Sequence, residues 1–215
     1  MVPPRFRLVT LLGVIAAGSV AACSPAAPAP APVDVDAAAE AWTEWRAARD
    51  SLFRSGDSPL PPPARNGFEG VPYFAYDSLA VVSAALVPAT SVQTAQFPTS
   101  TGELRPMTVA GQLVFSLGDT ERRLMAYQAV GPDGRPTAGL FVPFRDATSG
   151  RATYGGGRYL DLDGRPDTSG RIALDFNRAY HPYCVYSDAY SCPLPPAENA
   201  LAVAVEAGER LDGAK

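Results

Sequence analysis

The sequence lacks most of the motifs that identify an enzyme. Its single histidine, His181, would have to serve any serine triad, and the chain contains no GxSxG motif, phosphate-binding loop or dinucleotide fingerprint. Arginine and lysine form no run, and the formal net charge is −4. A nucleic-acid surface needs a basic excess. We therefore expect no nucleic-acid partner and no cofactor.

Proline and glycine are abundant instead, with 22 and 19 residues. This content is typical of many turns and short strands rather than of a helical bundle. The 215 residues suffice for one domain of ordinary size, and a hydrophobic content of 47% can supply a core.

The N-terminus has the pattern of an export signal. Arg5 and Arg7 precede an uncharged apolar stretch, residues 8–22, which is shorter than the roughly 20 residues of a bilayer-spanning helix. The stretch ends in "VAAC", which resembles a bacterial lipobox and predicts lipidation of Cys23 and removal of residues 1–22. An ordinary secretory cleavage site and an uncleaved anchor are the alternatives.

The stretch "SPAAPAPAPVD" alternates mainly alanine and proline, a composition that favours extended polyproline II and predicts a tether over residues 23–35. The expected location is the cell envelope, with the lipid on Cys23 in a membrane. Ser24, in place of an aspartate, favours the outer membrane, with the domain facing the periplasm.

The folded domain is expected over residues 36–215. It begins with one amphipathic helix, residues 36–56, capped by Asp36 and ended by Gly56. Trp42 and Trp45 lie on its apolar face, where they either dock on the core or form a binding surface.

After residue 70 the hydrophobic pattern has the two-residue period of strands. Gly118-Asp119 and Asp133-Gly134 mark reversals, and a last strand is expected at residues 200–205. About eight to ten short strands with one helix predict a mainly β fold, an antiparallel barrel-like or sandwich sheet.

The stretch "LFVPFRDATSGRATYGGGRYLDL", residues 140–162, combines strands with charges and glycines. Alternation places Arg145, Asp146 and Arg158 at strand ends, where a barrel mouth would lie. These charges form either an Arg–Asp network that staples strand ends or a mouth in which Arg145 or Arg158 binds an anion.

This stretch also resembles a known family. Together with "LDFNRAYHPYC", "CPLPPAENALAVAVEAGE" and "EAWTEWRAARDSLFRSGDSPL", it is similar to the signature blocks of a bacterial and archaeal family catalogued as domain of unknown function 1684. The resemblance spans roughly residues 38–210. It supports the domain boundaries and implies no particular reaction.

His181, Cys184 and Cys192 invite three interpretations. A thiol–imidazole pair would need a third, orienting group, and a zinc site would lack a fourth ligand and CxxC spacing. We favour a structural disulfide between Cys184 and Cys192, because export permits one, and we expect no metal. Two buried thiols are the alternative.

Four further polar residues are candidate ligands alongside the charges of residues 140–162: Asp175, Asn177, Glu198 and Asn199. The first hypothesis is a lipid-anchored domain that binds a small molecule or an envelope component. The second is a hydrolase that uses Asp175 and Glu198 as an acid–base pair, with Arg145 as an anion anchor. The third is a purely structural lipoprotein.

Overall fold

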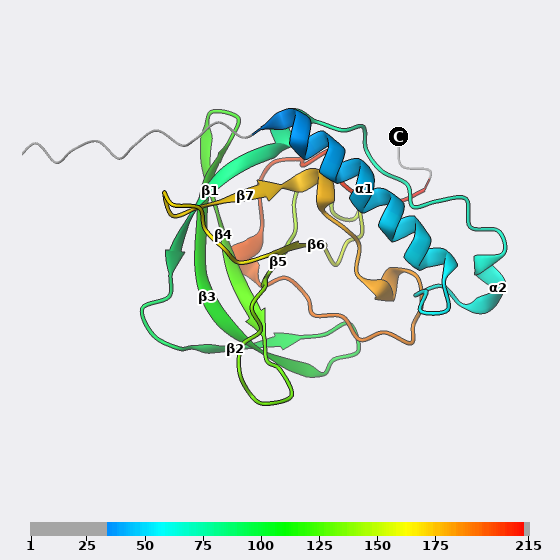
Figure 1. Cartoon of the computed structure of the whole chain (residues 1–215). Coiled ribbons are helices and arrows are strands. Elements are labelled where there is room, and N and C mark those ends of the chain that lie inside the picture. Colours follow the sequence, from blue (N-terminus) through cyan, green and yellow to red (C-terminus); the bar gives the residue numbers. More distant parts are fainter. Residues whose placement is uncertain (1–33, 213–215) are drawn as a thin grey trace, which may run out of the picture.

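The computed structural model describes residues 34–212, which form an antiparallel β structure with one long helix (Figure 1). The helix α1 is followed by a short helix and seven strands, with bounds as follows: α1 Val35–Arg54, α2 Pro62–Arg65, β1 Val81–Pro88, β2 Thr94–Pro98, β3 Leu104–Leu117, β4 Thr120–Ala129, β5 Leu140–Phe144, β6 Arg158–Leu162 and β7 Arg171–Asp175. Four short 3-10 helices lie between or after the strands: η1 Ser78–Ala80, η2 Phe176–Arg178, η3 Tyr183–Val185 and η4 Ala197–Asn199.

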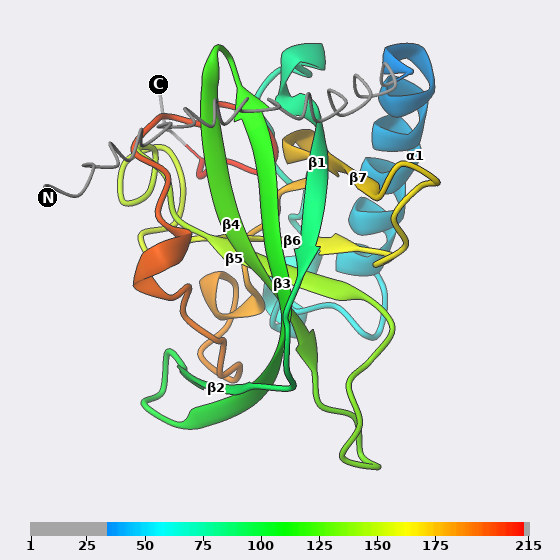
Figure 2. The same ribbon diagram turned by 90° about the vertical axis from the view of Figure 1, so that its left-hand side faces the viewer.

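The strands form one sheet in the order β6-β5-β4-β3-β1-β7, and β2 also pairs with β3. Every paired neighbour is antiparallel, and the sheet curls into a half-barrel (Figure 2). The predicted fold class is therefore confirmed. The described residues contain seven strands rather than eight to ten, and β6 and β7 remain the two ends of the order.

The β3–β4 hairpin forms the middle of this sheet. Both predicted reversals are confirmed: Gly118 links β3 to β4 with a φ of 59°, and Gly134 lies in the turn before β5 with a φ of 75°. Gly111 creates an irregularity in β3, and a Cβ there would lie 2.3 Å from the Val87 carbonyl oxygen. Only glycine permits that approach of β3 to β1.

Helix α1 begins and ends earlier than predicted. Asp34, not Asp36, caps it by accepting the Ala37 N–H at 3.1 Å, and the helix ends at Arg54 before an extended Ser55 rather than at Gly56. The helix packs on η1 and η2, at one end of β1 and β7. Trp42 docks there by donating its indole N–H to the Asn177 carbonyl at 3.0 Å.

No helix in the described part of the chain combines the length and the apolar character needed to span a bilayer.

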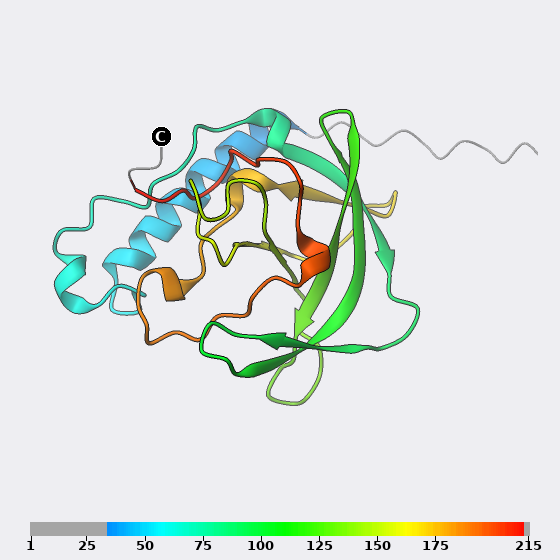
Figure 3. The same ribbon diagram turned by 180° about the vertical axis from the view of Figure 1, so that it is seen from behind.

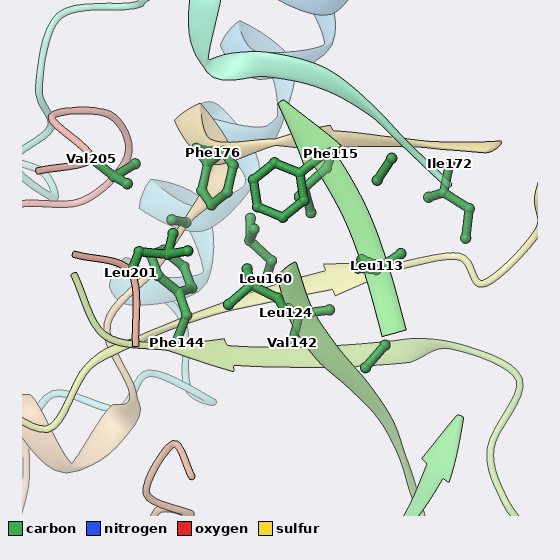
Figure 4. Packing of buried hydrophobic residues seen from close by; sticks show 14 of the residues in the cluster. Leu113, Phe115, Leu124, Val142, Phe144, Leu160, Ile172, Phe176, Leu201 and Val205 are labelled. Carbon is green, nitrogen blue, oxygen red and sulfur yellow. The ribbon is translucent and has the colours of Figure 1, made fainter. Parts of the chain in front are cut away.

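The main core fills the concave side of the sheet (Figure 4). Alternate residues of every strand except β2 point into it, as the two-residue period predicts. Leu113 and Phe115 of β3 meet Val142 and Phe144 of β5 and Leu160 of β6 there, all less than 3% exposed. A smaller cluster of Phe97, Met107 and Tyr127 lies on the opposite face.

The expected strand at residues 200–205 is not formed. This segment runs as irregular chain along the concave side of the half-barrel, and only Ala200 makes an isolated parallel bridge, to Arg145 (Figure 3). Leu201, Val205 and Ala207 enter the core from it. An apolar alternating segment thus covers the core without joining the sheet.

Candidate functional site

A cavity of about 590 Å³ lies on the face of β5 and β6 that is turned away from the main core. In β6, alternation sends Leu160 into the core and leaves Tyr159 and Asp161 facing the cavity. Phe141 of β5 lies beside them. The chain from Arg178 to Pro193 forms the opposing wall.

Aromatic side chains dominate this cavity. Phe141 and Tyr159 pack edge to face with ring centroids 4.7 Å apart, and Tyr159 and Tyr180 do so at 5.7 Å. On the other wall, Tyr183 and Tyr190 form a third such pair at 5.3 Å. These interlocking pairs fix ring orientations and leave a hollow whose walls are mostly carbon.

Two of the tyrosine hydroxyls are already occupied. Tyr159 donates its O–H to the Pro193 carbonyl at 2.5 Å, which ties β6 to the opposing wall. Tyr180 donates to Asp161 Oδ2 at 2.6 Å. Burial raises the pKa of Asp161 above its ordinary value, although the Tyr180 hydroxyl and the charges of Arg49 and Arg178 oppose that rise.

Three arginines line the same cavity. Arg49 of α1 lies 4.7 Å above the Tyr180 ring, and its Nε donates to the buried Glu209 carboxylate at 2.5 Å. Arg105 donates to the Ser191 carbonyl at 2.9 Å. Arg178 is the last residue of η2 and lies 5.9 Å from the Trp45 ring. Since Asp161 is the one carboxylate among the described residues that line the cavity, the surroundings of the cavity are net positive.

The wall formed by residues 190–194 is fastened to the β2–β3 turn. Ser191 shares hydroxyl contacts with Thr99 and Thr101, at 2.8 and 2.6 Å. Cys192 N–H donates to the Ser100 hydroxyl, and Ser100 N–H donates back to the Cys192 carbonyl at 2.8 Å. The cavity therefore has a preformed wall, as small-molecule sites usually do.

None of the predicted ligand residues lines this cavity. Asp146 and Arg158 form a buried ion pair instead, with Nη2 and Oδ2 2.7 Å apart. Arg158 also donates to the carbonyls of Val205, Ala207 and Glu209. This is the stapling network, one of the two interpretations of these charges, and the buried Arg158 guanidinium is not free to bind an anion.

Arg145, Glu198 and Asn199 lie together near β4 and β5, with different environments. Arg145 and Glu198 are exposed, whereas Asn199 is buried. The Asn199 side chain accepts the Met125 N–H at 2.7 Å and donates to the carbonyls of Met125 and Pro143. Because the register of β4 with β5 contains one pair, Tyr127 with Phe141, this amide supplies bonds that the ladder lacks.

Asp175 and Asn177 lie at the other end of the sheet. Asp175 caps η2 by accepting the Asn177 N–H at 2.9 Å, and the Asn177 amide bonds Asp77. Asp175 belongs to β7, whereas Glu198 contacts Tyr127 of β4. In the sheet order, β3 and β1 lie between these two strands. The structure thus does not bring the two proposed catalytic carboxylates together.

His181 has a structural environment. Its Nε2 accepts the Tyr154 N–H at 3.2 Å, and its own N–H donates to Glu209 Oε2 at 2.6 Å. Burial, with the nearby charges of Arg158 and Arg49, lowers the pKa of His181 to about 3. The imidazole is therefore neutral and committed to backbone rather than paired with a thiol.

Within the described residues, Cys184 and Cys192 are not bonded to each other, and the Cys184 N–H donates to Cys192 Sγ at 3.2 Å. Burial raises the pKa of Cys192 to about 12, so its thiol stays protonated and is a poor nucleophile. Residues 34–212 contain no cluster of three potential metal ligands.

Sequence reasoning missed the residues that do line the cavity, above all Tyr159, Asp161, Arg178 and Tyr180. Two signals pointed to them. The alternation in "RYLDL" places Tyr159 and Asp161 on one face, and "RAYHPYCVYSDAY" packs four tyrosines into a short segment. The charges of residues 140–162 instead favoured Asp146 and Arg158 as site residues, and these two residues stabilise the fold.

Comparisons with known proteins find one family and a similar solved structure. Residues 66–210 match a family described as "Protein of unknown function (DUF1684)". The solution structure of an uncharacterised protein from gene locus rrnAC0354 of Haloarcula marismortui is 37% identical, with a TM-score of 0.67, covering 85% of this chain and 98% of that one. No match was found among curated proteins.

Proposed function

The chain belongs to the DUF1684 family of proteins of unknown function, and from that premise we propose that its β domain binds a small ligand in the cavity beside β5 and β6. One observation carries the proposal. The cavity of about 590 Å³ lies within the usual size range of small-molecule sites and combines aromatic walls with a few polar groups.

The contacts around the cavity support a preformed site. Tyr159 is held by Pro193, and the wall at Ser191 and Cys192 is fastened to the β2–β3 turn. A ligand would therefore meet side chains whose positions are already fixed, which reduces the entropy lost on binding.

We further propose that this domain works on the surface of a membrane in the cell envelope, held by lipid on Cys23. The basic start, the apolar stretch of residues 8–22 and the "VAAC" sequence support this location. All of these residues lie outside the described part of the chain. Cys23→Ser should release the protein from the membrane fraction, and equal membrane retention of this variant would refute the anchor.

The binding proposal is tested on the mature protein purified gently from envelope extract. Native mass spectrometry should show a population carrying a small non-covalent ligand, which denaturation releases. A Thr137→Phe variant should lose it, since Thr137 lines the cavity and its hydrogen bonds in this structure come from its backbone.

Thr94→Phe is the matched control, because Thr94 is an exposed β2 residue outside the cavity lining. Retention of ligand by both variants would place the binding elsewhere. Absence of any ligand from the wild-type protein, across preparations, would favour a structural lipoprotein instead.

A further inference from the structure

The charges around the cavity restrict what it can bind. Arg49, Arg105 and Arg178 face it, against the single carboxylate of Asp161. Arg49 is neutralised by Glu209, which leaves two arginines against one carboxylate whose oxygen already accepts the Tyr180 hydroxyl. This excess of positive charge would repel a cationic ligand and attract an anion.

Arg178 is the arginine best placed to bind such an anion. Arg49 is committed to Glu209, and Arg105 to the Ser191 carbonyl. Within residues 34–212, Arg178 forms no ion pair, donates no side-chain hydrogen bond and is exposed. Its contact with the Trp45 ring, at 5.9 Å, is the kind of stacking that orients a guanidinium and leaves its N–H groups available.

The rest of the lining fits a flat apolar ring. Phe141 and Tyr159 form one side, and Tyr183 and Tyr190 the other. The hydroxyls of Tyr159 and Tyr180 are occupied within the protein, so they offer few hydrogen bonds to a polyol such as a sugar. Aromatic rings pack well against such walls, edge to face or offset.

Building on the binding function above, we propose that the ligand is an anion that carries a flat ring. The ring lies between the tyrosine pairs and Phe141, and its carboxylate or phosphate group accepts hydrogen bonds from the Arg178 guanidinium. Both anionic groups match the planar fork of arginine, so the structure assigns the charge and shape of the ligand rather than its exact headgroup.

The test uses four small probes with one ring each: benzoate, phenyl phosphate, benzamide and benzylamine. Their dissociation constants are measured with the mature domain by amide chemical-shift titration. Benzoate or phenyl phosphate should bind about tenfold more tightly than benzamide, with benzylamine weakest, and the preference should shrink at high salt. The stronger of the two anions identifies the headgroup class.

Arg178→Gln should abolish the preference for the anions over benzamide. Arg165→Gln is the matched control. Arg165 is exposed and lines a neighbouring hollow, which Arg178 and Asp161 also line, but it does not line the cavity itself. Equal binding of benzamide and benzoate, or an unaffected Arg178→Gln variant, would refute the proposal that the ligand is an anion. The proposed binding function would still hold.

If none of the four probes shifts cavity amides, the ring-bearing anion is also overturned. The binding function is then judged separately by the ligand that copurifies and by its loss in Thr137→Phe, so the two failures remain distinguishable.

Discussion

Arg158 of β6 and Asp146, which follows β5, form an ion pair that is almost completely shielded from solvent, with both side chains at most 1% exposed. The guanidinium also holds three carbonyls of the chain after residue 204. One arginine thus joins the edge of the sheet to the irregular segment that covers the core.

Replacing Arg158 by methionine should destabilise the fold strongly. Asp146 would be left buried without its cation, and removal of one partner from such a pair typically costs about 3–5 kcal/mol. Urea unfolding of the variant measures the loss. Arg123→Met is the control, since Arg123 and Glu121 form an exposed pair and should contribute less than about 1 kcal/mol. Similar losses for both variants would contradict the assigned role.

Asn199 and Glu198 are adjacent in sequence but should respond very differently to alanine. Asn199→Ala removes three bonds to the backbone of β4 and β5 and leaves those buried groups unpaired, at a cost of about 2–3 kcal/mol. Glu198 is exposed and accepts one bond, from Tyr127 at 3.3 Å, so Glu198→Ala should change stability by less than about 1 kcal/mol. Thermal and urea unfolding measure both effects, and an equal or larger loss for Glu198→Ala would show that Glu198, and not Asn199, stabilises this part of the sheet.

His181 should make the protein acid-sensitive. Its pKa is lowered to about 3 in the folded state by burial and the nearby charges of Arg158 and Arg49, while the unfolded chain has a pKa of about 6.5. The unfolded state therefore binds a proton first, and the stability associated with this group is complete above pH 6.5 and is lost as the pH falls toward 3.

Between pH 7.5 and 5, the wild-type protein should lose about 2 kcal/mol more than His181→Asn. Asparagine also offers an acceptor for the Tyr154 N–H. Glu209 and the other carboxylates are present in both proteins, so the difference between the two urea-unfolding series reports the imidazole. Parallel pH curves would show that His181 becomes protonated without unfolding the protein.

The sequence predicted the sheet because local signals determine it. Leu113 and Phe115 alternate with Gln112, Val114 and Ser116, and Gly118 permits the left-handed turn between β3 and β4. The same signals failed at residues 200–205. Val203 and Val205 look strand-like, yet the backbone N–H of Val205 faces Asp146, and its carbonyl accepts a bond from Arg158 instead of a strand.

The site could not be located in the same way, because charge in a sequence does not reveal burial. Arg158 and Arg178 are the same residue type, but Arg158 is buried beside Asp146, whereas Arg178 is exposed at the cavity. Their difference arises from contacts between segments far apart in sequence, such as the bond from Tyr159 to Pro193.

The proposed disulfide between Cys184 and Cys192 should be present in protein isolated from an oxidising envelope. The Cys184 N–H already reaches Cys192 Sγ at 3.2 Å, so the two side chains are neighbours, and oxidation by a disulfide donor would form the bond and release two protons and two electrons to that donor. Alkylation of denatured protein, followed by mass spectrometry, should label neither cysteine before reduction and both afterwards. Cys184→Ser with Cys192→Ser should lower the free energy of unfolding by about 2–3 kcal/mol under oxidising conditions and by much less in reductant.

Full alkylation without reductant would instead show two structural thiols. In that case, only noncovalent contacts would hold the cavity wall that carries Tyr190 and Ser191, and the hydroxyl contacts of Ser191 to Thr99 and Thr101 are among them. Thr99→Val with Thr101→Val would then loosen this wall, whereas with the disulfide in place the same pair should have little effect, because the loop between the cysteines is already closed. Hydrogen exchange of the Tyr190 amide, which bonds the Ser187 carbonyl at 3.2 Å, measures that difference.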